Sequence, residues 1–140
     1  MNSKPDKAIV IIGTLDTKEP EVDYLCSEIE IRGHRALVIA PGVLRIPQIR
    51  ADITREEVAG AGGRKLSDLV KNAELGVYRG NITQVMMQGL ASIAKDLYSS
   101  GKMEGIISLG GSTGTALAGA SMKVLPTGIP KIAVSTSIYV

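Results

Sequence analysis

The sequence predicts an α/β domain built on a doubly wound parallel sheet, with helices on both faces. Two observations lead to this prediction. Short runs that are apolar throughout alternate with longer segments of helical periodicity, and such runs are typical of strands buried on both faces of a parallel sheet. Glycine or proline follows most of these runs and ends the element in a turn. The 140 residues suffice for one domain with a sizeable core.

Four segments fit the expected strands. Ala8 to Ile12 is a continuous aliphatic run that stops at Gly13, and a second run stops just before Pro41 and Gly42. Both patterns favour a buried strand that leads directly into a turn. The expected strands are 8–12, 36–39, 105–109 and 131–135.

The helices are expected between these strands. Pro20 fits the first turn of a helix, where its missing N–H group costs nothing, and Gly33 ends that helix. Thr54 and Glu57 have the spacing of a capping box, in which each side chain accepts a hydrogen bond from the backbone of the other residue. The expected helices lie from Pro20 to Gly33, from Thr54 to Gly62, from Leu66 to Gly76, over 81–99 and over 115–124, and a loop spans 43–53.

The order of the elements limits the possible topologies. Connections between parallel strands are right-handed, so we expect the strand order 2-1-3-4 of a Rossmann-like fold, with the winding reversed between the first and third strands. Open sheets of this kind bind ligands at the carboxyl ends of the strands, at the point of reversal. The segments that follow the first and third strands are therefore expected to lie side by side.

Both of these segments are turns rich in glycine and hydroxyl side chains, over 13–18 and 110–115. A strand that feeds a helix through such a turn directs free N–H groups and the positive end of the helix dipole to one point, which favours phosphate. The second turn lacks the lysine of a P-loop and the spacing of a dinucleotide fingerprint. A nucleotide bound here would therefore be held in another way.

The first turn offers several candidate ligands. Thr14 and Thr17 suit phosphate or ribose, Asp16 suits a sugar hydroxyl or Mg²⁺ held through water, and Lys18 suits a phosphate. The alternative is that Asp16 or Thr17 caps the helix while Lys18 is solvated. Asp52 is either a further group in the same crevice or a helix cap.

The second turn offers close backbone approach at Gly110 and Gly111 and hydroxyl donors beyond them. The alternative is a tight turn in which Ser112 or Thr113 caps the next helix. Arg79, before the long helix, adds a guanidinium group that can grip phosphate, although a solvated arginine is the more common case. The candidate cofactor-binding residues are Gly13, Thr14, Asp16, Thr17, Lys18, Arg79, Gly80, Gly110, Gly111, Ser112, Thr113, Gly114 and Thr115.

Composition argues against several other classes. One cysteine, Cys26, and one histidine, His34, exclude an internal disulfide and a cluster of such ligands around a metal. A net charge of +2 with no Trp or Phe argues against a nucleic-acid surface. There is no apolar run long enough for a membrane span and no signal-peptide core, so we expect a cytoplasmic protein. No catalytic triad or carboxylate pair stands out, which leaves open whether the protein is an enzyme.

Several segments resemble, in order, the family that includes the tomato mosaic virus resistance protein. They are 12–18, 51–59, 107–115, 125–131 and 134–136, and they cover nearly the whole chain. The resemblance implies an ATP-binding N-terminal domain that continues into a second α/β domain and binds a protein partner. It also implies that the first turn lies near the nucleotide, that the second turn wraps the phosphates, and that Arg79 faces the same cleft.

The leading hypothesis is therefore a domain that binds ATP, with or without Mg²⁺. The alternatives are a protein-interaction module with a vestigial cleft, and part of an enzyme for a small phosphorylated or carboxylated metabolite. The family pattern is lost after Thr136, so residues 1–140 are expected to be a truncated part of a larger protein. An apolar last strand then lacks cover, which predicts a homo-oligomer or packing against a missing second domain.

Overall fold

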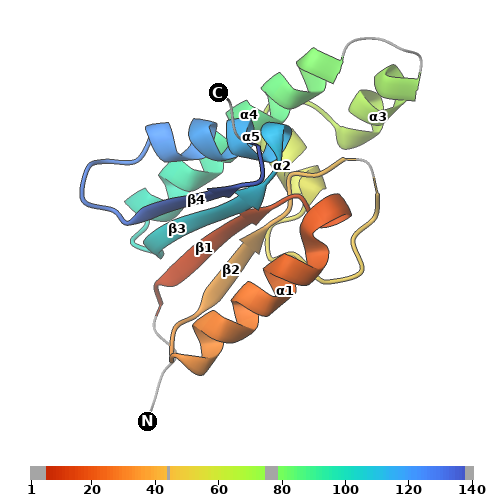
Figure 1. Ribbon diagram of the computed structural model, residues 1–140. Helices are drawn as coiled ribbons and strands as arrows, with labels where there is room; N and C mark the ends of the chain where they lie inside the picture. The colour runs from red at the N-terminus through yellow and green to blue at the C-terminus, as the bar shows by residue number, and fades with distance from the viewer. Residues whose placement is uncertain (1–5, 44, 75–78, 138–140) are drawn as a thin grey trace.

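The computed structural model describes residues 6–43, 45–74 and 79–137. Strands and helices alternate along the chain (Figure 1). The strands are β1 (Ala8–Gly13), β2 (Ala36–Ile39), β3 (Met103–Gly110) and β4 (Lys131–Ser135). The helices are α1 (Leu15–Ile31), α2 (Arg55–Ala61), α3 (Leu66–Glu74), α4 (Arg79–Ser99) and α5 (Ser112–Lys123).

The strands form one parallel sheet in the order β2-β1-β3-β4, which confirms the expected fold class and topology. β1 lies between β2 and β3, and the register pairs Gly13 with Leu109 and Gly110 with Ser135. The carboxyl ends of β1, β3 and β4 therefore share one edge of the sheet (Figure 1).

Helices cover the two faces of the sheet unequally. Of the described helices, α1 alone packs on one face, whereas α2, α4 and α5 pack on the other (Figure 1). Alternate side chains of β1 divide between the two cores, because successive residues of a strand point to opposite faces. Ile11 joins Val22 of α1, while Val10 and Ile12 join the larger core under α4.

Two glycines allow α2 and α4 to pack closely. A Cβ atom on Gly89 would lie 1.9 Å from the carbonyl oxygen of Val58, and one on Gly62 would lie 2.2 Å from that of Val85. Both neighbours are backbone atoms, so a side chain at either position would force the helices apart. The absence of a side chain at these positions therefore sets the spacing between α2 and α4.

The free edge of β2 is covered by the chain itself. The backbone of Ile53 forms a parallel bridge with Ile39, and the N–H groups of Asp52 and Ile53 donate to the carbonyl of Val38 at 2.9 and 3.0 Å. In return, the N–H of Val38 donates to a carboxylate oxygen of Asp52 at 2.8 Å. The end of the expected loop 43–53 is thus a strand-like cover, and Asp52 binds β2 instead of capping a helix.

The helix boundaries confirm the expected elements but correct several ends. The capping box of α2 is present, with Glu57 N–H donating to Thr54 Oγ1 and Thr54 N–H donating to the Glu57 carboxylate at 2.7 Å. α1 begins at Leu15, before Pro20, and loses helical geometry at Lys18. The kink separates a short first turn from the proline-led helix that the sequence predicts. The expected stop at Gly76 lies outside the described residues.

Among the described residues, no helix combines the length and the apolar character needed to cross a bilayer.

Candidate functional site

The first turn places a helix start directly at the end of β1. Gly13 is buried, and a Cβ atom there would lie 2.3 Å from a methyl group of Val22, so glycine lets α1 approach the strand. Thr14 occupies the N-cap position of α1, but its side chain does not cap the helix. Its hydroxyl lies 3.0 Å from that of Thr17. Thr14 is the N-cap residue, so the alternative of capping by Asp16 or Thr17 does not hold for the start of α1.

The two charged residues of this turn have different surroundings. Asp16 is buried, and its carboxylate points at Gly42, where a Cβ atom would lie 2.5 Å from Oδ1. The guanidinium group of Arg45 donates to the carbonyl oxygen of Asp16. Lys18 is half-buried, and its ammonium group lies 3.6 Å from a carboxylate oxygen of Glu21. Asp16 thus joins the first turn to the loop after β2, while Lys18 stays near the helix surface.

The second turn brings the start of α5 against the end of β3. A Cβ atom on Gly110 would lie 2.7 Å from the Cα atom of Gly114, so these two glycines permit the contact. Gly111 is the N-cap residue, so the alternative in which Ser112 or Thr113 caps this helix does not hold. Both hydroxyl residues lie exposed in the first turn of α5, which begins three residues before the expected start at 115.

The two turns meet at the edge of the sheet, as expected. A Cβ atom on Gly114 would lie 4.0 Å from the methyl group of Thr14, which is van der Waals contact. The register of β1 with β3 produces this proximity, since Gly13 pairs with Leu109 immediately before the second turn. Glycine and hydroxyl groups that are far apart in the sequence therefore line one short edge.

The end of β4 adds hydroxyl groups that were absent from the candidate set. Thr115 Oγ1 lies 2.7 Å from both the carbonyl oxygen of Gly111 and Oγ of Ser135. A Cβ atom on Gly111 would lie 3.7 Å from Oγ1 of Thr136 and 4.0 Å from Oγ of Ser137. The rule that places ligands at the carboxyl ends of parallel strands applies to β4 as well, and would have identified these residues.

Arg79 and Gly80 form the first turn of α4, which begins on the same side of the sheet as the carboxyl ends of the strands (Figure 1). The side chain of Arg79 lies outside the described part of the structure, so its expected position in the cleft stays a prediction.

The sequence profile of the Uncharacterised protein family (UPF0261) N-terminal domain matches residues 7–138. The chain belongs to the UPF0261 family. A UPF0261 protein of Clostridium tetani is 44% identical over 131 residues, which are 94% of this chain and 31% of that protein. UPF0261 proteins of Brucella suis and Rhizobium meliloti are 31% and 33% identical, over 94% and 93% of this chain and 30% and 31% of their own lengths. The chain therefore spans about 31% of the length of such relatives.

At the carboxyl edge of this UPF0261 domain, the starts of α1 and α5 and several hydroxyl groups lie together. Hydroxyl groups and backbone N–H groups donate to phosphate or carboxylate oxygens. The described residues contain no group of three or more His, Cys, Asp or Glu side chains that could hold a metal ion.

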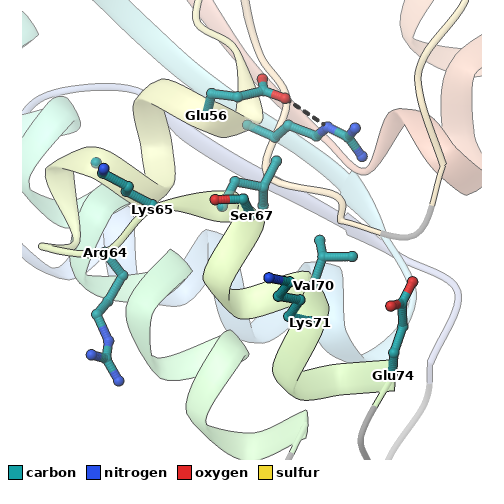
Figure 2. Close-up of a pocket in the computed structure, with 10 residues that line it drawn as sticks. Glu56, Arg64, Lys65, Ser67, Val70, Lys71 and Glu74 are labelled. Carbon is teal, nitrogen blue, oxygen red and sulfur yellow. Dashed lines mark hydrogen bonds and ion pairs between the residues drawn. The ribbon is translucent and has the colours of Figure 1, made fainter.

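A separate hollow of about 650 Å³ lies between α2 and α3 (Figure 2). Leu66 and Val70 contribute apolar surface, and charged residues such as Lys65 and Lys71 stand around them. Glu56 is paired with Arg55 at 3.2 Å. The first residues of α2 and α3 line this hollow, and Ser67 adds a hydroxyl group. The start of α2 is already capped by Thr54 and Glu57, so the hollow is a weaker candidate for a phosphate ligand.

Proposed function

We propose that the carboxyl edge of the sheet binds the phosphate groups of a nucleotide, and that this nucleotide is ATP with or without Mg²⁺. The observation that supports the proposal most directly is the state of the helix starts. α2, which begins near the end of β2, has a complete capping box, whereas the described starts of α1 and α5 have no side-chain cap. The first N–H groups of a helix without a cap remain available for a bound anion.

The surrounding groups fit the same ligand. The exposed hydroxyls of Thr17, Ser112 and Thr113 can donate to phosphate oxygens, and two helix dipoles favour negative charge between them. The choice of ATP among phosphorylated ligands rests on the resemblance of the 12–18 and 107–115 segments to the family of the tomato mosaic virus resistance protein. Glycine at 111 leaves room for phosphate beside Thr136.

Calorimetric titration with ATP, with and without Mg²⁺, tests the proposal. Gly111→Val is the informative variant, because Gly111 has a negative φ of −85° and a Cβ atom would have no contact closer than 3.7 Å. The valine side chain should therefore fit the fold but occupy the space for phosphate. We expect micromolar binding that weakens by at least roughly tenfold in the variant, the equivalent of one lost charge-assisted contact.

The matched control is Gly119→Val in the same helix, where a Cβ atom would meet nothing within 4 Å. This variant should bind ATP as the wild-type chain does. The exposed pair Ser112→Ala and Thr113→Ala tests the hydroxyl groups, and it is preferable to a change at Thr115, whose hydroxyl contacts Gly111 and Ser135. Absence of heat with a folded wild-type chain would overturn the nucleotide proposal. Tighter binding of a small phosphorylated or carboxylated metabolite would point instead to an enzyme for that metabolite.

A further inference from the structure

β4 differs from the other strands in its exposure. β1, β2 and β3 are largely buried, whereas Ile132 and Val134 of β4 are 56% and 48% exposed. Both are β-branched apolar residues in a parallel strand, an environment that is normally buried on both faces. This strand therefore has the composition of a sheet interior and the exposure of a surface.

The exposed side chains of β4 continue an apolar strip on the α1 side of the sheet. The register places Ile132 beside Ile107 and Val134 beside Leu109, and paired residues of neighbouring parallel strands point to the same face. Ile107 and Leu109 are half-buried at the margin of the core that α1 covers. We call these four residues the β3–β4 strip. α1 packs on β1, β2 and β3, so it covers part of Ile107 and Leu109. Ile132 and Val134 lie beyond α1 and stay exposed (Figure 1).

The two edge strands of the sheet, β2 and β4, also differ in how their outer backbone groups are covered. The edge of β2 is paired with residues 52–53 of the same chain. Among the described residues of β4, Lys131 is the only charged side chain, and its ammonium group binds the carbonyl of Pro126 at 2.8 Å. A charge directed into the preceding loop does not protect an edge strand from pairing.

The relatives are much longer than the segment that matches this domain. The match is to the N-terminal domain of the family, and more than two-thirds of the Clostridium tetani protein lies outside the matched segment. The match to the family's N-terminal domain runs to residue 138, just after β4. Sheets of this class carry helices on both faces. The strip lies beside α1, where one more helix would complete the layer.

We propose that, in full-length UPF0261 proteins, the polypeptide that follows this domain packs an apolar helix face beside α1, over the β3–β4 strip. The proposal does not rest on nucleotide binding, although the strip reaches the carboxyl edge of the sheet at Leu109 and Val134. It makes this domain and the following part of the chain one packed unit.

Site-specific thiol labelling tests the proposal. Cysteine is introduced as Ile132→Cys in the 140-residue chain and at the aligned position of the full-length Clostridium tetani protein. Reaction with N-ethylmaleimide is followed at that residue by mass spectrometry, so other cysteines do not interfere. The control is Ser99→Cys, an exposed position in α4 on the opposite face of the sheet, with its aligned position in the relative.

We expect the introduced thiol at 132 to react freely in the short chain and at least roughly tenfold more slowly in the full-length protein, since packing requires local opening before reaction. The control thiol should react at the same rate in both. Equal rates at 132 in the two proteins would overturn the proposal. A second outcome would also overturn the proposal: the thiol at 132 reacts slowly in a dimer of either protein, and its reaction rate rises when the protein is diluted. A second copy of the chain would then cover the strip.

Discussion

The contact between α2 and α4 makes a specific prediction for glycine substitutions. A Cβ atom on Gly89 would lie 1.9 Å from the carbonyl oxygen of Val58 and 3.1 Å from the backbone nitrogen of Gly62. Carbon–oxygen contacts in proteins are rarely shorter than about 3.3 Å, so Gly89→Ala must separate the helices by roughly 1 Å or more. Overpacking of this kind costs about 3 kcal/mol at the upper end of its usual range. Alanine returns about 1 kcal/mol of helix propensity, which leaves a net loss of about 2 kcal/mol.

Gly119→Ala is the matched comparison, because a Cβ atom there would meet nothing within 4 Å. No steric cost then offsets the gain in helix propensity, so the variant should be about 1 kcal/mol more stable than the wild-type chain. For a domain of this length, 1 kcal/mol corresponds to about 3 °C in Tm. Far-ultraviolet circular dichroism during heating and urea titration should thus show Tm lowered by about 6 °C in Gly89→Ala and raised by about 3 °C in Gly119→Ala. A Gly89→Ala protein as stable as wild type would refute the close packing of α2 against α4.

Three further predictions concern single side chains. Thr54→Ala removes a capping box and should lower the free energy of unfolding by about 1 kcal/mol in urea titration, whereas Thr54→Ser should retain most of it. Glu19→Ala removes the carboxylate that accepts the N–H of Ile49 at 2.6 Å, so that amide should exchange at least roughly tenfold faster by mass spectrometry; unchanged exchange would contradict the role of Glu19. Burial, together with nearby carboxylates, raises the pKa of Cys26 above its ordinary value of 9.0. The associated stability is present below pH 9.0 and lost as the pH rises through the raised pKa, so the urea midpoint should fall more steeply there than in Cys26→Ser.

The fold could be predicted from the sequence because each strand has a local pattern of apolar residues that identifies it. The strand segments, such as Ala8 to Ile12, are strongly apolar. Right-handed crossovers then leave few topologies, among which the strand order 2-1-3-4 was predicted. The capping box at Thr54 was predictable for the same reason, since both partners lie within one helical turn. Local patterns identify elements whose stabilising contacts are also local.

The remaining features depend on contacts between distant segments. The kink at Lys18 lets the chain begin a helix at Leu15 and still place Pro20 near the start of a regular one. The pairing of Ile53 with β2 carries no periodic signal, because it involves one short stretch of backbone. Asp16 is buried against Gly42 because two loops meet there. The sequence pattern, which indicated a ligand-binding role for Asp16, contains no signal for this contact.

The difference between the two sheet edges also determines what assemblies this domain can form. Residues 52–53 already pair with the edge of β2, so among the described strands β4 has the more open edge. A subunit with one unpaired edge strand forms a closed dimer with a second copy, because the two edge strands pair with each other. Open-ended filaments need two complementary edges on every subunit. The end of the 43–53 loop therefore removes one of the two edges at which another copy could add a strand.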